Sequence, residues 1–240
     1  MRDYAKYAGK LVDLVYPRRC PVCDEPVPVE DELICGDCVK KIRYIEGARC
    51  RKCSKGLTDD TKIYCTDCEK RTHIFEYGYA LYHYQDMHES IYRYKSRGRM
   101  EYAKFYAKDI GRHLEWEIRH MGAQALIPVP LHPSRERMRG YNQAQVLTRE
   151  LEPLLGIPAR TDIIKRVRRT VPQKELDGLE RQNNLKKAFF ISSDVVKLKK
   201  VIVVDDVYTT GSTIDAVAEE LRHHGVEQVY FITLCIGEGV

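Results

Sequence analysis

One run of residues specifies the architecture of this chain: Val201-Ile202-Val203-Val204-Asp205-Asp206-Val207-Tyr208-Thr209-Thr210-Gly211-Ser212-Thr213. Its four successive β-branched apolar residues are typical of a parallel strand that is buried on both faces. Two carboxylates come next, where we expect that strand to end, and a hydroxyl-rich loop with one glycine then leads into a helix. The helix is predicted to end at Gly225 and to bury one face, which carries Ile214, Val217, Ala218 and Leu221.

The turn after this strand has the composition of a phosphate site. Ligands of open α/β sheets bind beyond the carboxyl ends of the strands, and a helix N-terminus offers free N–H groups to an anion. Residues 209–213 can therefore surround a phosphate with amides and hydroxyls. The ionised side chains of Asp205 and Asp206 suit vicinal ribose hydroxyls or a hydrated Mg²⁺. The alternative is an ordinary strand–turn–helix with surface acids.

This pattern resembles the phosphoribosyl-pyrophosphate (PRPP) motif of type I phosphoribosyltransferases. The resemblance implies that Asp205 and Asp206 bind the ribose. It assigns the 5-phosphate to a loop made of Thr209, Thr210, Gly211, Ser212 and Thr213. It also implies that the turn at 128–132, which contains Pro130 and Leu131, takes the place of the pyrophosphate loop. The basic segment 166–174 would correspond to the flexible catalytic hood.

This sequence differs from the active transferases at one position of the motif. Purine-type transferases have an aspartate where this chain has Thr209, so a contact that assists the purine ring is absent. Orotate-type transferases tolerate threonine there and rely on a loop lysine, for which Lys174 is the candidate catalytic residue. If the site is active, it would use Mg²⁺ with PRPP, and the sequence identifies no acceptor base.

Eight of the nine cysteines form four Cys-x-x-Cys pairs near the N-terminus, and the third and fourth pairs repeat the first two at a displacement of 30 residues. The eight residues are Cys20, Cys23, Cys35, Cys38, Cys50, Cys53, Cys65 and Cys68. Two-residue spacing lets both thiolates of a pair bind one tetrahedral ion. Disulfides are the alternative, but a cytoplasmic chain keeps its thiols reduced. We expect two structural zinc ions without an open coordination position.

Two pairings of these cysteines are open. Sequential pairing joins Cys20/Cys23 with Cys35/Cys38 and Cys50/Cys53 with Cys65/Cys68, which makes two tandem ribbons and respects the repeat. An interleaved cross-brace is the alternative. Each ribbon is too small to bury a core, so metal binding would supply its folding free energy. The ninth cysteine, Cys235, lies in an apolar run at 229–236 and is expected to be a buried core thiol.

Composition and charge limit the class of protein. The chain has 240 residues and a net charge of +5, enough for one core and a small module, but not a charge that argues for nucleic acid by itself. No apolar run approaches the ~20 residues that span a membrane. Charges at Asp3, Lys6, Lys10 and Asp13 interrupt the N-terminus, which excludes a signal peptide. We expect a short amphipathic helix there and a cytoplasmic protein.

Strand and helix patterns alternate through the rest of the chain. A strand or hairpin is predicted at 74–84, a helical region at 87–120 that Gly98 interrupts, and a helix that starts at Gly140-Tyr141-Asn142-Gln143 and ends near Gly156. Further strands are predicted at 125–131, 159–166 and 188–191. The pattern predicts an α/β fold of the phosphoribosyltransferase type, a mostly parallel sheet with helices on both faces. The expected domains are an N-terminal helix at 1–16, a double zinc ribbon at 17–73 and the sheet domain at 74–240.

Three basic segments are expected at or near the carboxyl edge of this sheet, facing the phosphate loop. A solvated surface is the simpler interpretation for each residue alone, but convergence favours binding of a polyanion such as single-stranded DNA. The candidate DNA contacts are Lys95, Arg137, Arg139, Arg166, Arg168, Arg169 and Arg181.

The whole chain resembles the ComF family of competence proteins, which join a double zinc ribbon to a phosphoribosyltransferase-like domain. The matching residues are the paired cysteines, Tyr94-Lys95 with Gly98, Pro128-Val129-Pro130-Leu131, Arg139-Gly140-Tyr141-Asn142-Gln143-Ala144, Arg166-x-Arg168-x-Thr170 with Gln173, Arg181 with Asn184, and Asp205-Asp206. The resemblance implies a role in natural transformation, acting on incoming single-stranded DNA with a helicase-like ATPase partner of the ComFA type. It places the protein in the cytoplasm, at the inner face of the membrane through its partners. The alternative function is an active phosphoribosyltransferase with an unidentified acceptor.

Overall fold

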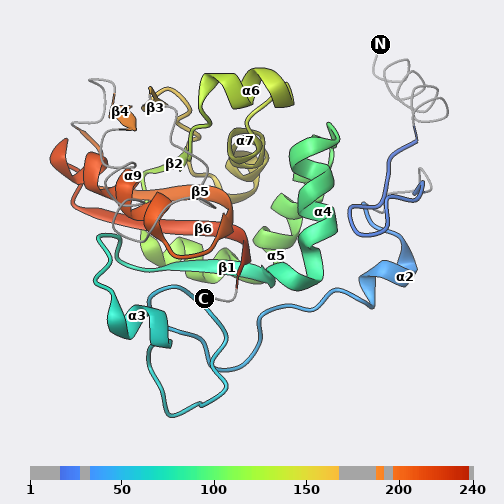
Figure 1. Cartoon of the computed structure of the whole chain (residues 1–240), viewed down its shortest axis with the longest axis horizontal. Coiled ribbons are helices and arrows are strands. Elements are labelled where there is room, and N and C mark those ends of the chain that lie inside the picture. The colour runs from blue at the N-terminus through green and yellow to red at the C-terminus, as the bar shows by residue number, and fades with distance from the viewer. Residues whose placement is uncertain (1–16, 28–32, 168–187, 192–196, 238–240) are drawn as a thin grey trace.

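A four-stranded parallel sheet forms the centre of the computed structural model, which describes residues 17–27, 33–167, 188–191 and 197–237. The strand order is β1 (Gly78–His83), β6 (Gln228–Ile236), β5 (Lys200–Tyr208) and β2 (Ala125–Pro128). Each neighbouring pair in this order is parallel, so the carboxyl ends of the four strands lie at one edge (Figure 1). The predicted mostly parallel sheet is confirmed.

Strand β5 lies between two neighbours and is buried on both faces. Val201 and Val203 belong to the core on one face of the sheet, and Ile202 and Val204 belong to the core on the other. The expectation that the strand ends before the acid pair is wrong. Strand β6 stays in register with β5 up to Tyr208, and Asp205 lies opposite Thr233. Strand β2 stops opposite Val204, in a run of alternating prolines that does not favour a longer strand.

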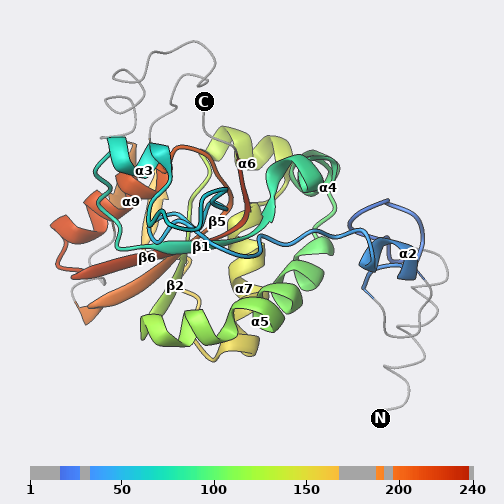
Figure 2. The same cartoon turned by 90° about the horizontal axis from the view of Figure 1, so that it is seen from below.

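Helices cover both faces of the sheet. Helices α4 (Tyr84–Ser96), α5 (Tyr102–Met121) and α7 (Gln143–Leu155) pack on one face, and α9 (Ser212–His223) packs on the other, as Figure 2 shows. The predicted break at Gly98 separates α4 from α5, and this glycine has a left-handed φ of 70°. No helix in the described part of the chain combines the length and the apolar character that a membrane crossing needs.

Two features of the sheet domain differ from expectation. The segment predicted as a strand at 159–166 forms a single bridge from Ala159 to Leu126 and a short strand β3 (Ile164–Arg166). Strand β3 pairs antiparallel with β4 (Phe189–Ile191) in a separate two-stranded sheet. The sequence did not predict this pairing, because the hydrophobic pattern of such short strands does not specify a partner. The segment after β2 forms an unexpected helix α6 (Pro133–Arg139), which begins with proline and ends at the left-handed Gly140.

The cysteine-rich segments pack against different cores. The first, with α2 (Gly36–Val39), packs into the core with α4 and α5, and the second, with α3 (Thr66–Lys70), packs into the core with α9 (Figure 1). The linker between them crosses the exposed edge of β1, where Tyr44 bridges Tyr82 and the amide of Ile45 donates to Leu81 at 3.1 Å. The linker therefore covers an edge that could otherwise pair with another strand.

The hydroxyls of Tyr44 and Tyr82 both donate to Asp109 of α5, at 3.0 and 2.5 Å. This carboxylate is 2% exposed, so the two bonds satisfy a charge that would be costly to bury unpaired. The linker is fixed to the sheet and to the helix layer at the same point.

Replacement of Gly78 should destabilise the sheet. An added Cβ would lie 2.4 Å from the backbone oxygen of Phe231 and 2.3 Å from its ring, so the strands must separate. We expect Gly78→Ala to lower the free energy of unfolding by about 1–3 kcal/mol, measured by denaturation of the zinc-loaded protein. The control is Gly111→Ala within α5, where nothing lies within 4 Å of the added carbon. Gly111→Ala should raise the free energy of unfolding by about 0.5–1 kcal/mol. Equal effects of the two replacements would contradict the packing argument.

Candidate functional site

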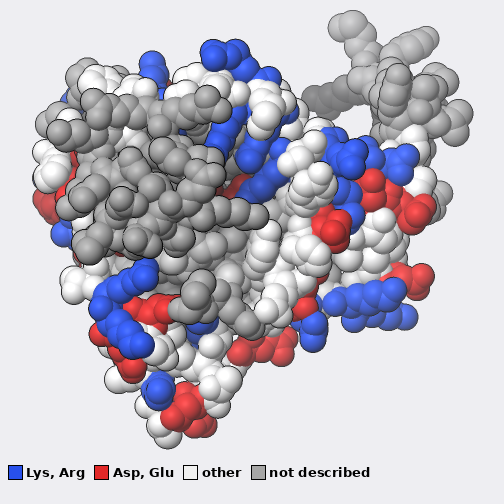
Figure 3. Space-filling model, viewed as in Figure 1, with Lys and Arg blue, Asp and Glu red and all other residues white. Residues whose placement is uncertain are grey.

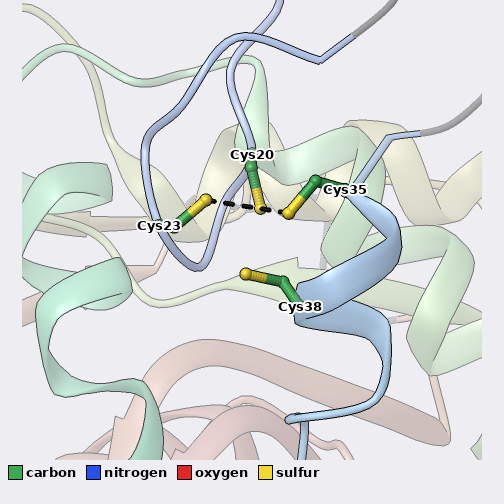
Figure 4. A group of neighbouring side chains, drawn as sticks. All are labelled: Cys20, Cys23, Cys35 and Cys38. Carbon is green, nitrogen blue, oxygen red and sulfur yellow. Dashed lines mark hydrogen bonds between the residues drawn. The ribbon is translucent and has the colours of Figure 1, made fainter.

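The eight paired cysteines form two groups of four sulfurs. Cys20, Cys23, Cys35 and Cys38 make the first group, and Cys50, Cys53, Cys65 and Cys68 make the second. Within each group all sulfurs lie within 4.8 Å of one another, and Figure 4 shows the four side chains of the first group pointing toward a common centre. The pairing is sequential, so the interleaved alternative is wrong.

The sequence repeat is also a repeat in backbone structure. The residue after the second cysteine of each ribbon has a left-handed φ of 65°, at Asp24 and at Ser54. Their amides donate to Cys20 at 2.9 Å and to Cys50 at 2.8 Å. Such a tight turn brings both thiols of a pair to the same side of the loop.

The geometry of both groups fits zinc. The sulfurs of Cys23 and Cys35 are 3.7 Å apart, and those of Cys53 and Cys65 are 3.6 Å apart. A tetrahedral ion with Zn–S bonds of about 2.3 Å spaces its sulfurs ~3.8 Å apart. A disulfide would place sulfurs at about 2.05 Å, which neither pair approaches. Four thiolates complete the coordination, so both sites are structural zinc sites with no open position.

The acid pair lies at the carboxyl edge of the sheet, and its two members have different surroundings. The carboxylate of Asp206 forms an ion pair with Lys95 of α4, with 2.8 Å between Nζ and Oδ1. Both side chains are mostly buried, at 24% exposure for Lys95 and 12% for Asp206. Lys95 was expected in a basic rim that faces DNA, and it lies inside the acid site as the counter-ion of Asp206.

Asp205 is the half-buried member of the pair. Burial, and then the negative charge of Asp206, raise the pKa of Asp205 to about 7, against the opposing effects of a hydrogen bond and of nearby cations. The hydrogen bond comes from the amide of Asp206 at 2.8 Å, and the cations are Lys95 and Arg166. Asp205 is therefore expected to exchange a proton near neutral pH.

The predicted phosphate loop forms a tight turn into α9. Gly211 is the N-cap residue with a left-handed φ of 78°, and no side chain caps the helix. The hydroxyls of Thr210 and Ser212 lie 2.9 Å apart, Thr209 is exposed, and Thr213 is half-buried. Free amides at the start of a twelve-residue helix and clustered hydroxyls suit an oxyanion.

The predicted basic residues divide into three groups. Arg137 and Arg139 lie on α6, directly after β2. Arg166 ends β3, stacks 5.5 Å from the ring centre of Phe189, and lies close enough to Asp205 to affect its pKa. Arg168, Arg169, Lys174 and Arg181 lie outside the described residues, as do the N-terminal segment 1–16 and most of the predicted hood.

A cavity of about 540 Å³ opens beside this edge. Its lining includes Pro130 and Leu131 from the predicted pyrophosphate turn, Arg166 from β3, and Glu136 and Asn142, which sequence analysis did not assign to the site. The side chain of Asn142 caps α7 by accepting from Ala144 at 3.0 Å and donates to Val129 at 3.0 Å. Its signal in the sequence was a polar residue directly before a helix.

Sequence analysis also missed the contacts that join α4 to the start of α7. The hydroxyl of Tyr94 donates to the carbonyl of Gln143 at 2.7 Å, and the hydroxyl of Tyr141 donates to the carbonyl of Tyr94. The Gln143 side chain donates to the carbonyl of Lys95 at 3.3 Å. These bonds fix Lys95 opposite Asp206, and no local pattern in the sequence encodes them.

The raised pKa of Asp205 predicts a pH-dependent stability. Because the folded-state pKa of about 7 lies above the reference value of 3.8, the free energy of unfolding falls as the pH rises from about 4 to 7, and the full cost of ionised Asp205 is present above pH 7. We expect Asp205→Asn to raise the unfolding free energy at pH 8 by about 1 kcal/mol or more, ~2–4 °C in Tm, and to have no effect near pH 4.

The matched control is Asp162→Asn. The Arg160 guanidinium lowers the pKa of Asp162, so this change should destabilise slightly at pH 8 instead. A gain for Asp205→Asn that is the same at pH 4 and pH 8 would contradict the assigned titration.

Two family models match this chain. Residues 11–69 match the double zinc ribbon domain, and residues 137–238 match the phosphoribosyl transferase domain. The first covers both cysteine groups, and the second covers the end of α6, the acid pair and the phosphate loop.

Three curated relatives cover different shares of the chain. The chain is 44% identical over 108 residues to competence protein F of Haemophilus influenzae, 35% over 148 residues to DNA utilization protein YhgH of Salmonella typhimurium, and 29% over 154 residues to competence protein ComFC of Streptococcus pneumoniae. These matches cover 44%, 60% and 62% of this chain and 47%, 65% and 63% of the relatives. The matched part thus spans between about half and two thirds of those proteins.

Among solved structures, a purine phosphoribosyltransferase from Pyrococcus horikoshii aligns with a TM-score of 0.37 at 18% identity, over 55% of this chain and 74% of that one. A hypoxanthine phosphoribosyltransferase from Staphylococcus aureus aligns with a TM-score of 0.34 at 15% identity, over 59% and 74%. The relatives and the two domain matches in one chain support a ComFC-like organisation, in which a double zinc ribbon is joined to a phosphoribosyl transferase domain.

Proposed function

We propose that this protein acts in DNA uptake by competent cells, where it binds incoming single-stranded DNA in the cytoplasm together with a helicase-like ATPase of the ComFA type. The partner would hold it at the inner face of the membrane. The names of the relatives, which refer to competence and to DNA utilization, support the biological role. The support from this chain is a basic surface at the tips of α4 and α6.

The observation that carries the proposal is the charge at the tips of α4 and α6. We call Arg97, Arg135, Arg137 and Arg139 the α4–α6 surface. Figure 3 shows Lys and Arg side chains gathered over α6 and in the hollow between α6 and α4. Arg97 and Arg137 are exposed, and Arg139 is close enough to Lys95 to affect its pKa. The cations and the phosphate loop thus lie at one edge of the molecule, as a chain of phosphates requires.

Exposed apolar side chains accompany these cations. Tyr92 is 51% exposed and Met138 is 77% exposed, and the Arg97 guanidinium lies 6.0 Å from the ring centre of Tyr92. Bases of single-stranded DNA stack on aromatic rings and guanidinium planes without sequence preference. A surface that combines both features suits single-stranded DNA better than duplex DNA.

Removal of two arginines from this surface should weaken DNA binding and its salt dependence. We expect Arg137→Ala/Arg139→Ala to lower the slope of log affinity against log salt by about 1.4, since each phosphate contact on a single strand contributes ~0.7. Fluorescence anisotropy with an oligo-dT strand measures this slope. The matched control is Arg112→Ala/Arg119→Ala on α5, whose side chains are 74% and 58% exposed. Equal slopes for the two double variants would place the DNA site elsewhere, for example on the ribbons.

The second candidate function is transfer of ribose phosphate from PRPP. The cavity of about 540 Å³ favours it, because it lies beside the sheet edge and has room for an acceptor. Asp205 and Asp206 would bind the ribose with Mg²⁺ while the loop binds the 5-phosphate. Lys95 would then exchange its contact with Asp206 for the ligand.

A calorimetric titration of the zinc-loaded protein with PRPP and Mg²⁺ tests this second function. We expect binding by the natural chain and loss of binding in Asp205→Asn/Asp206→Asn, because amides no longer attract Mg²⁺ as carboxylates do. Asp162→Asn serves as the control for loss of a carboxylate away from the site. Absence of binding by the folded natural chain would rule out PRPP transfer, and the site would then serve DNA alone.

A further inference from the structure

The segment that leaves the second ribbon holds the first turn of α9. The Nδ1 atom of His73 lies 2.7 Å from Oδ2 of Asp215, and the amide of Ile74 donates to Oδ1 of Asp215 at 2.8 Å. A carboxylate only accepts, so the proton of this pair sits on His73. The His73 side chain is 2% exposed, which protects the bond from water. Two successive residues thus bind both oxygens of one carboxylate, and we call this contact the His73–Asp215 clamp.

The clamp lies directly behind the phosphate loop. The amide of Asp215 donates to the carbonyl of Gly211 at 2.8 Å, so the carboxylate and the loop belong to the same helical turn. A Cβ placed on Gly211 would lie 3.0 Å from Cε1 of His73 and 2.6 Å from the hydroxyl of Tyr208. The loop backbone therefore rests on the imidazole and on the tyrosine.

The imidazole is in turn held by an aromatic cluster. Its ring stacks on Phe75 with 4.7 Å between centres, and Phe75 meets the edge of Phe231 at 4.9 Å. The second ring nitrogen of His73, Nε2, is buried and has no partner among the described residues. An unsatisfied buried polar atom carries the cost of its lost hydration, so packing alone would be better served by phenylalanine. A histidine suits this position because its Nδ1 forms the hydrogen bond to Asp215, which phenylalanine could not form.

The second ribbon determines where His73 lies. Cys65 and Cys68 belong to the turn and helix of α3, which ends just before this segment, and the thiols of the second group share a core with Phe75 and Tyr208. The first ribbon is fixed elsewhere, since Asp24 accepts from Arg99 at 3.0 Å and from Tyr102 at 2.5 Å on the α4–α5 face. Metal binding at the second group is therefore in mechanical contact with the phosphate loop, whereas within the described residues the first group is held against α4 and α5.

We infer that His73 is a positioning residue through which the second zinc ribbon shapes the phosphate loop. With zinc bound, α3 holds the His73–Asp215 clamp, and the clamp fixes the turn whose amides and hydroxyls receive the phosphate. Loss of zinc from the second ribbon releases that turn and weakens binding of a phosphate ligand. The inference deepens the proposed phosphate site and rests on it for its biological use, but the coupling itself exists without a ligand.

The first test compares two replacements of His73 in the zinc-loaded protein. His73→Phe keeps a ring against Phe75 and loses the donor to Asp215, whereas His73→Asn keeps a donor close to the position of Nδ1. Titration with PRPP and Mg²⁺ should show at least about tenfold weaker binding for His73→Phe and recovery to within about threefold for His73→Asn. Zinc content should stay the same in both variants. Natural affinity in His73→Phe, or equal loss in both variants, would overturn the inference.

The second test needs no ligand and therefore separates this inference from the proposed function. It measures the backbone amides of Gly211 and Asp215 by NMR and their hydrogen exchange in the free protein. Cys65→Ser, which removes a ligand of the second zinc, should shift the Gly211 signal and speed exchange of the Asp215 amide about tenfold or more. Asp24→Asn, which loosens the first ribbon, should leave both amides unchanged, and the Val203 amide reports whether the sheet stays folded.

The outcomes of the second test are distinct. An unchanged Asp215 amide in zinc-depleted Cys65→Ser would refute the coupling even if PRPP binds the natural chain. A perturbed loop in a protein that fails to bind PRPP would support the coupling and refute the PRPP site alone.

Discussion

Strand β5 is buried on both faces and has a parallel neighbour on each side up to Val204, and this enclosure determines how the acid pair is held. Beyond Val204 the strand keeps β6 as a neighbour and loses β2. The two aspartates are therefore fixed by a regular backbone and still have one open side. Charged groups are tolerated there because Lys95 and the end of β3 supply cations and water reaches the edge.

The two zinc ribbons depend on the same sheet in different ways. Each ribbon is too small for a core of its own, so metal binding supplies its folding free energy. The linker over β1 connects the two ribbons, which pack with different cores, and a carboxylate helps to fix each of them. Asp24 fixes the first ribbon to Arg99 and Tyr102, and Asp215 of α9 receives the segment that leaves the second. The repeat in sequence therefore supports two modules with different neighbours.

Charge is arranged in layers around the sheet edge. Asp205 and Asp206 lie innermost, Lys95 neutralises one of them, and the arginines of α6 lie outside. Both proposed functions draw on these charges, because a nucleic acid backbone and a nucleotide-like phosphate are both anionic.

The sequence by itself determined the parts that local pattern encodes. The β-branched run predicted a parallel strand buried on both faces, and this strand is β5. The glycines indicated the ends of α7 and α9. The 30-residue repeat favoured the sequential cysteine pairing that the structure confirms. Periodicity, caps and ligand spacing act over a few residues, so they can be recognised without a fold. The proline at the start of α6 was such a signal and was missed.

The tertiary structure alone decided which side chains meet. It placed Lys95 on Asp206 rather than in the basic rim, extended β5 past the acid pair, and joined His73 to Asp215 across 142 residues of sequence. It also paired β3 with β4 outside the main sheet. Such contacts depend on how whole elements pack, because a side chain selects its partner from everything that the fold brings near, and nothing in its own neighbourhood of the sequence specifies that partner.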